Sequence, residues 1–174
     1  MGRTPDDFIR IERQDLVQKS ADNFLSAHAL KQAFDQTWAA FEQKLIREFE
    51  AAWYDRFSEN LSPLPEYEIR FQLHQNSYGF RALRDGVEVA ASQEAALQPL
   101  VALALDIPRL KHDANWLAWR WMESRYFDNL PLAEFYQAAT NEATRLALFE
   151  GIMQEGAYYV AQFKERVAAH FPGQ

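Results

Sequence analysis

The sequence predicts a mostly helical α+β fold, in which a small three-stranded antiparallel β-meander at about residues 67–91 packs against long antiparallel helices. One observation is the alternation of apolar and polar residues over residues 67–74, which is typical of a strand with one buried face. The other is a pair of apolar seams with spacings of three and four residues, one on each side of the meander, which is typical of amphipathic helices. We expect a single domain over residues 1–174, because no repeat, low-complexity stretch or linker interrupts the chain.

The first elements are expected to be residues 1–20, as either a short helix or an extended N-terminal arm, and a long helix over residues 22–60. Ser20 or Asp22 is suited to cap this helix, because its side-chain oxygen can accept a hydrogen bond from a backbone N–H of the first turn. Residues 60–65 should end the helix, since they contain two prolines, which cannot continue its hydrogen bonds. The seam of the helix consists of Leu30, Phe34, Trp38, Phe41, Leu45, Phe49, Ala52, Trp53 and Phe57.

The meander is expected to consist of three short strands separated by turns. Residues 75–77 have turn chemistry, and Asp85-Gly86 fits a type I′ hairpin turn, in which both central residues need a positive φ. A sheet of this size is not stable by itself, so helices must cover its apolar face. That face of the first strand carries Tyr67, Ile69, Phe71 and Leu73.

Helices are expected again over residues 92–170. Residues 92–106 have helical composition, with Pro99 causing a kink or marking a second helix start. Asp113 is suited to cap a short helix that contains the tryptophan-rich residues 115–127.

The segment from residue 130 to about residue 170 has the clearest helical periodicity in the chain. Either one very long helix or two helices broken near Thr140-Asn141 satisfies it. We expect its seam to pack antiparallel on the seam of the first long helix, although the same pattern suits a homodimer interface.

Composition and charge restrict the classes of function. The chain carries 25 acidic against 18 basic residues, a formal net charge of −7, which disfavours binding to nucleic-acid phosphates. It has no cysteine, so disulfides, thiol catalysis and zinc–thiolate sites are excluded. The first residues lack a signal-peptide core, and no apolar run is long enough to span a bilayer. We therefore expect a cytoplasmic protein with no membrane partner.

No set of residues has the spacing of a known catalytic or metal-binding motif. None of the four histidines has a glutamate three residues before it or another histidine four residues away, so helical metal motifs are absent. The sequence also lacks a Walker phosphate loop, a dinucleotide fingerprint and a nucleophile elbow. We expect no cofactor, no metal and no catalytic residue.

Glu68-Ile69-Arg70 resembles the Glu-x-Lys strand of the PD-(D/E)XK nuclease superfamily, in which the acid binds a metal ion and the lysine orients water. The resemblance implies a metal-dependent nuclease with Glu68 as a metal ligand. As an enzyme, the protein would be a hydrolase or nuclease that works through Glu68, His74 and acids brought close by folding. Arg70 departs from the motif, because arginine cannot be deprotonated as that lysine can, and no earlier strand supplies the partner aspartate. Residues 115–121 and the helix after them resemble the C-terminal region of some members, which implies at most a shared helical accessory region.

The tryptophan-rich residues 115–127 are the first candidate interaction surface. As a helix this segment is apolar nearly all the way round, so it must lie in the core or be covered by a partner. The structural interpretation is a buried helix between the sheet and the long helices. The functional interpretation is an exposed anchor formed by Trp119 and Arg120 beside Trp116, because Trp and Arg dominate the energies of interfaces.

The polar side chains of the first predicted strand are the second candidate surface. Glu68, Arg70, Gln72 and His74 share one face of that strand. An ordinary solvated sheet face has the same pattern. The functional interpretation is a recognition platform, on which His74 would make binding sensitive to pH near neutrality.

The leading prediction is a non-enzymatic cytoplasmic protein that binds another protein or itself, as an inhibitor, an immunity protein or an adaptor does. A small-ligand-binding domain, with a pocket between sheet and helices, and a metal-dependent hydrolase are the alternatives.

Overall fold

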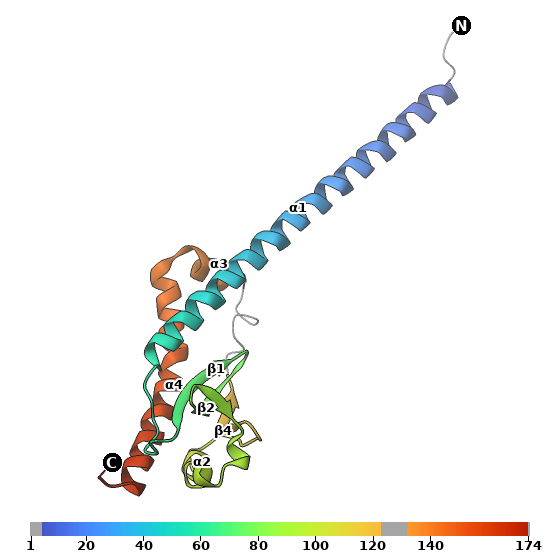
Figure 1. The fold of residues 1–174 in the computed structure, drawn as a ribbon. Coiled ribbons are helices and arrows are strands. Elements are labelled where there is room, and N and C mark those ends of the chain that lie inside the picture. Colours follow the sequence, from blue (N-terminus) through green and yellow to red (C-terminus); the bar gives the residue numbers. More distant parts are fainter. Residues whose placement is uncertain (1–4, 123–131, 174) are drawn as a thin grey trace. The chain divides into compact units, whose positions relative to one another are not determined.

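The computed structural model of the chain describes residues 5–122 and 132–173, and it confirms a mostly helical α+β fold. Contacts between residues divide the chain into two compact units, residues 1–43 and residues 44–174. The described part of the first unit is helix alone, whereas the second unit contains the sheet (Figure 1). The elements, in chain order, are α1 (Pro5–Arg56), β1 (Glu68–His74), β2 (Ser77–Arg84), β3 (Val87–Val89), 3-10 turns at Ala91–Gln93 and Ala95–Leu97, α2 (Gln98–Leu105), β4 (Trp116–Trp121), α3 (Leu132–Thr140) and α4 (Glu142–His170).

Helix α1 starts earlier than predicted and ends close to the predicted position. Residues 5–20 are helical, which was one of the two alternatives, but the predicted helix start at Ser20 or Asp22 is wrong, because α1 runs through both residues. Proline is compatible with the first turn of a helix, where its missing N–H would have no intrahelical partner. No helix in the described part of the chain, α1 included, combines the length and apolar character needed to cross a bilayer.

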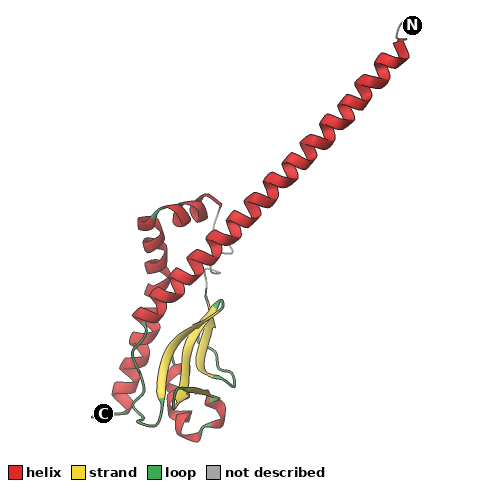
Figure 2. Ribbon diagram, turned by 45° about the horizontal axis from the view of Figure 1, so that its top comes forward, coloured by secondary structure: helices red, strands yellow, loops and turns green. Residues whose placement is uncertain are grey.

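The sheet contains the predicted meander and one additional strand (Figure 2). β1 and β2 pair antiparallel, with Glu68 opposite Leu83 at one end and His74 opposite Ser77 at the other. The turn residue Asp85 has a φ of 53° and the following glycine a φ of 77°, as the predicted type I′ turn requires. β3 and β4 both pair antiparallel with β2, at different parts of its length.

The additional strand β4 overturns the prediction of a tryptophan-rich helix. Trp116–Trp121 form a strand paired with β2, so the three tryptophans of this strand lie on one face of the sheet and do not surround a helix. Gly79 of β2 is required for this pairing, because a Cβ atom there would lie 2.3 Å from the carbonyl oxygen of Ala118. Residues 123–127 of the predicted helix lie outside the described residues.

One face of the sheet, here called the inner face, packs on the C-terminal turns of α1 and on α4. The Trp53 ring of α1 lies 5.4 Å from the Phe71 ring of β1, and Phe80 of β2 stacks on Phe163 of α4 at 4.4 Å. Gly156 makes room for this packing, since a Cβ atom there would lie 2.8 Å from the ring of Trp53. Both helices therefore cover the apolar face of the sheet, as the sequence predicted.

Where α1 and α4 meet in the second unit they run parallel, so the predicted antiparallel pairing is wrong. Glu48 pairs with Arg145 at 2.6 Å, and Glu59, just after α1, pairs with Lys164 at 2.8 Å, so the contacts advance in the same direction along both segments. The parallel arrangement is possible because the sheet and α2 lie between the two helices in the chain. The seam of α4 is buried within the chain through Phe149, Ile152, Met153, Gly156, Tyr159 and Phe163.

The segment from residue 130 to about residue 170 contains two helices, which was one of the two alternatives that the sequence left open. α3 ends at Thr140, and Asn141 caps α4 by accepting a hydrogen bond from the backbone N–H of Thr144 at 3.1 Å. Pro99 likewise marks a helix start, in the first turn of α2.

Candidate functional site

The outer face of the sheet, opposite the inner face, brings together two surfaces that the sequence predicted separately. Side chains alternate along each strand, so the strand register groups them into rows that cross the sheet. The rows, from β1 through β2 to β4, are Arg70–Arg81–Trp116, Gln72–Gly79–Trp119 and His74–Ser77–Trp121. Glu68 shares the face with Arg70 at the start of β1. Of the predicted interface residues, only Arg120 lies on the inner face.

The tryptophans of the outer face differ in exposure. Trp121 is 56% exposed, and its ring contacts that of the half-buried Trp119 edge-on, with 5.1 Å between ring centroids. Trp116 is only 5% exposed, and the guanidinium group of Arg81 lies 4.0 Å above its ring. Trp121, which sequence reasoning did not select as an anchor, is therefore the most accessible tryptophan of β4.

Two polar atoms of the outer face are buried without a hydrogen-bond partner among the described residues, namely Trp119 Nε1 and Arg81 Nε. Another part of the same guanidinium group is paired with Glu88. A buried polar group without a partner is uncommon in folded proteins and costs about 1–3 kcal/mol. This property distinguishes the outer face from an ordinary solvated sheet face.

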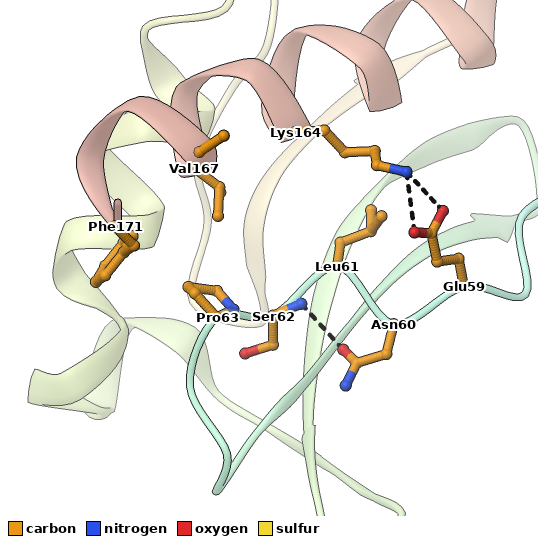
Figure 3. A pocket seen from close by; sticks show the side chains of 9 residues that line it. Glu59, Asn60, Leu61, Ser62, Pro63, Lys164, Val167 and Phe171 are labelled. Atoms are coloured by element: carbon orange, nitrogen blue, oxygen red, sulfur yellow. Dashed lines mark hydrogen bonds and ion pairs between the residues drawn. The ribbon is translucent and has the colours of Figure 1, made fainter. Parts of the chain in front are cut away.

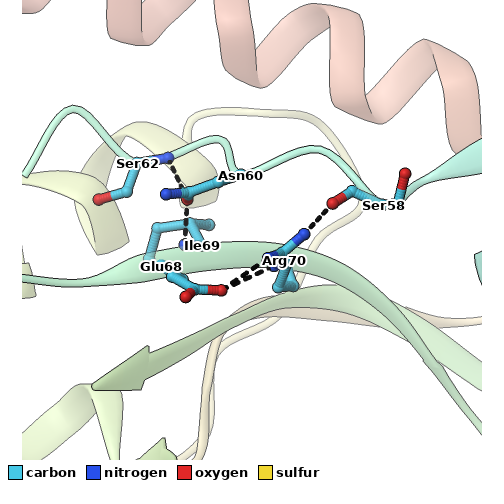
Figure 4. A network of polar contacts seen from close by, with 6 residues as sticks. All are labelled: Ser58, Asn60, Ser62, Glu68, Ile69 and Arg70. Carbon is cyan, nitrogen blue, oxygen red and sulfur yellow. Dashed lines mark hydrogen bonds and ion pairs between the residues drawn. The ribbon is translucent and has the colours of Figure 1, made fainter. Parts of the chain in front are cut away.

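Glu68 and Arg70 take part in a network that joins the loop after α1 to β1 (Figure 4). Arg70 donates to the Glu68 carboxylate through Nε at 3.0 Å and Nη2 at 2.7 Å, and through Nη1 to the carbonyl oxygen of Ser58. These two predicted residues thus have a structural function that does not depend on a partner. Gln72 is half-buried and His74 exposed further along β1.

Both outer edges of the sheet are partly covered by the chain itself. At β1, the Asn60 side chain accepts a hydrogen bond from the Ile69 N–H at 2.9 Å, and the Leu61 N–H donates to the Ile69 carbonyl at 2.8 Å. At β4, Trp119 and Lys111 exchange two backbone hydrogen bonds of 2.8 and 2.7 Å. Covered edges disfavour the addition of a strand from another chain, so a partner has better access to the face of the sheet.

Arg120 is buried on the inner face, so the prediction that it is exposed beside Trp119 is wrong. Its side chain is 8% exposed, lies 3.0 Å from the Glu155 carboxylate and donates to the hydroxyl of Tyr159. Burial, and then the charge of Glu155, raise the pKa of the neighbouring Tyr78 above its ordinary value. Because side chains alternate along β4, Arg120 lies on the other face of the sheet from its neighbours Trp119 and Trp121.

A pocket with a volume of about 460 Å³ opens beside this ion pair. Its lining residues are Pro108, Arg109, Arg120, Glu155, Tyr158 and Tyr159. The described lining residues include two arginines and one glutamate, and Arg120 and Glu155 pair with each other. Guanidinium groups and phenol rings suit a ligand with a flat apolar part and an anionic group.

A second pocket, of about 280 Å³, lies between the loop after α1 and the last turns of α4 (Figure 3). Its two charged lining residues, Glu59 and Lys164, pair with each other at 2.8 Å. The other lining residues are neutral, among them Asn60, Pro63 and Phe171. This pocket therefore offers fewer groups for ligand recognition than the pocket beside Arg120.

Neither a metal-ligand cluster nor a similar known protein indicates the function. Within the described ranges, no three His, Asp or Glu side chains are placed to hold a metal ion together. Comparisons with protein-family models, curated proteins and solved structures found no significant match to this chain. The function must therefore be argued from the surfaces themselves.

Proposed function

We propose that the protein is a protein-binding module whose recognition surface is the outer face of the sheet. The observation that carries this proposal is the exposed ring of Trp121 beside the half-buried ring of Trp119. Tryptophan is enriched among the few residues that supply most of the energy of a protein interface. Inhibitors, immunity proteins and adaptors are the classes of small acidic protein to which such a module belongs.

The surroundings of the two tryptophans support the same proposal. Gln72 and His74 border them on the β1 side, with only Gly79 and Ser77 of β2 between. An apolar centre with a polar rim is the usual anatomy of a protein interface. Gly79 and Ser77 are themselves buried, so the accessible groups of this part of the face are the tryptophan rings, Gln72 and His74.

The test compares tagged wild-type chain with Trp121→Ala in retention from a lysate of its own cells, with and without nuclease. Tyr136→Ala is the matched control, because Tyr136 is a similarly exposed aromatic residue, 61% accessible, on α3. We expect one protein to be retained by wild type and by Tyr136→Ala, in both conditions, and to be lost with Trp121→Ala. With that protein purified, Trp121→Ala should weaken the Kd by roughly thirtyfold, the equivalent of about 2 kcal/mol.

Two outcomes contradict the proposal. Retention unchanged in Trp121→Ala and in the double variant Trp119→Ala/Trp121→Ala would place the binding site elsewhere. Retention that disappears after nuclease treatment would identify a nucleic acid as the bridging component. Circular dichroism of each variant would confirm that the sheet is retained.

A second candidate function, binding of a small ligand, is supported by the pocket beside Arg120. Its volume lies within the usual range of ligand pockets, roughly 300–1,000 Å³. We expect an aromatic carboxylate to raise the melting temperature of the wild-type chain, because a ligand that binds only the folded state stabilises it. The increase should be smaller in Arg109→Gln, and an increase of equal size in that variant would exclude the pocket.

A further inference from the structure

In the first unit, α1 exposes large apolar side chains to solvent, and most of them, Val17 and Leu25 excepted, lie on one side of the helix. Leu16, Phe24, Leu30 and Phe34 are 64, 71, 73 and 54% exposed. Each residue of an α-helix turns about 100° around the helix axis, so these four residues and Trp38 lie within about 60° of one line along the helix surface. We call these five residues the apolar stripe. Contiguous exposed apolar surface of this kind is typical of an interaction site.

The stripe is arranged symmetrically about Ala27. The pairs at three, seven and eleven residues from Ala27 are Phe24 and Leu30, Ser20 and Phe34, and Leu16 and Trp38. A two-fold axis at Ala27 would place an antiparallel copy of the helix so that each pair shares one layer of side chains. The smallest residue, Ala27, would lie at the axis, where it allows the two backbones to approach closely. Each of these three pairs contains at least one large apolar side chain, whereas the pair at four residues from Ala27, Asn23 and Lys31, is polar.

The charges near the stripe are compatible with a buried seam. Lys31 lies close to the line of the stripe, and it pairs with Asp35 of the same helix at 2.6 Å. Lys31 can keep this partner at the rim of the seam, because its long side chain can extend toward solvent. No described acidic residue lies on the line of the stripe between Leu16 and Trp38.

The size of the stripe is also sufficient for a stable dimer. Residues 16–38 span about 34 Å of helix at 1.5 Å per residue. Covering the stripe and its flanks would bury roughly 700 Å² on each copy, close to the 800 Å² or so per partner of a standard specific interface.

We propose that a second copy of this chain covers the apolar stripe, as an antiparallel helix pair centred on Ala27. The arrangement favours a second copy as the occupant, because a two-fold axis at Ala27 sets Leu16 against Trp38 and Phe24 against Leu30, so four of the five stripe residues meet another stripe residue. This surface is separate from the outer face of the sheet, so the proposal is independent of the function proposed above.

The first experiment measures the mass of the full-length chain by sedimentation equilibrium over a wide concentration range. Wild type should reach the dimer mass, whereas Leu30→Glu/Phe34→Glu should dimerise at least roughly a hundredfold more weakly, because it places two charges in the seam. Gln32→Glu/Gln36→Glu is the matched control, since it adds the same charge at the same spacing on the opposite side of the helix. The control should dimerise like wild type.

The second experiment tests the direction of the pair and uses the absence of native cysteine. Under mild oxidation, Ala27→Cys should form a disulfide-linked dimer. Leu16→Cys alone and Trp38→Cys alone should remain largely unlinked, and their mixture should yield the mixed dimer. Only the antiparallel arrangement brings residue 16 of one copy close to residue 38 of the other.

Several results would overturn the inference. A wild-type chain that stays monomeric at all concentrations excludes a second copy as the occupant of the stripe. A dimer that persists in Leu30→Glu/Phe34→Glu must use another surface. Linkage of Leu16→Cys to itself, or of Trp38→Cys to itself, without the mixed product would establish a parallel pair and refute the symmetry about Ala27.

Discussion

Gly156 is a position where the core has no room for a methyl group. A Cβ atom there would lie 2.8 Å from the ring of Trp53 and 3.1 Å from the rings of Phe57 and Phe71. Gly156→Ala should therefore force these rings apart, at a cost of about 1–3 kcal/mol. The higher helix propensity of alanine returns up to about 1 kcal/mol of this, so we expect a net loss. Urea denaturation would measure the change in the free energy of unfolding.

Gly151, in the same helix, is the control for this prediction. Apart from its chain neighbours and the backbone of its own helix, a Cβ atom there would meet no atom within 4 Å. Gly151→Ala should raise the free energy of unfolding by about 0.5–1 kcal/mol, because only the helix propensity changes. Equal effects of the two substitutions would show that close packing is not what requires glycine at residue 156.

Single residues also show which part of the outer face was predictable. The alternation in β1 was sufficient to place Glu68, Arg70, Gln72 and His74 on one face, because it depends only on neighbours in sequence. Their convergence with Trp119 depends on the pairing of β2 with β4, between residues 40 apart in sequence for Gly79 and Trp119. The burial of Arg120 by α4 has no local signal for the same reason.

Among the elements, one carboxylate joins three parts of the chain: the residue before β1, strand β2 and the turn region after β3. Glu94 accepts a hydrogen bond from the Tyr67 hydroxyl at 2.8 Å and one from Arg84 at 2.6 Å. The hydrogen bond from Tyr67, followed by that from Arg84, lowers the pKa of Glu94 below its ordinary value of 4.5. A lowered pKa in the folded state means that the ionised carboxylate stabilises the fold above its unfolded-state pKa. That stabilisation is lost as the pH falls through the folded-state pKa.

We therefore expect Glu94→Gln to unfold at a lower urea concentration than wild type at neutral pH. The difference should shrink as the pH falls below the ordinary pKa of a glutamate and the wild-type carboxylate also becomes neutral. Urea midpoints of both proteins across this range would measure it. A difference that stays constant with pH would instead indicate a change in packing, not the loss of an ionised group.

The elements differ in how clearly their sequences predict them. The meander and the helices have regular periods of two or about 3.6 residues, and these were recognised. In β4 the alternation is hidden, because the register shifts after Phe80 of β2 and the inward position holds Arg120. Strands favour aromatic and β-branched residues, so the three tryptophans of this segment were the signal that could have predicted a strand. The parallel direction of α1 and α4 could not be predicted, since an apolar seam has the same spacing in both directions.

For the molecule as a whole, the buried core belongs to the second unit. Every described residue of the apolar core lies between Leu45 and Phe163. Between residues 15 and 37 of the first unit, all side chains are exposed. The seam predicted for the first helix is thus buried only in its C-terminal part. The prediction of a single domain over residues 1–174 remains a prediction, and a truncated chain can test it.

A chain of residues 44–174 should fold cooperatively without the first unit, because it retains every described core residue. We expect its free energy of unfolding to lie within about 1 kcal/mol of that of the full-length Leu30→Glu/Phe34→Glu variant, since deleted surface residues contribute little. This variant is the appropriate reference, because dimerisation would stabilise the wild-type chain by an amount that depends on protein concentration. Urea denaturation and sedimentation would measure stability and mass, and any partner bound through Trp121 should be bound equally well. Loss of cooperative unfolding would instead mean that residues 1–43 contribute to the same folding unit, and that the chain is one domain.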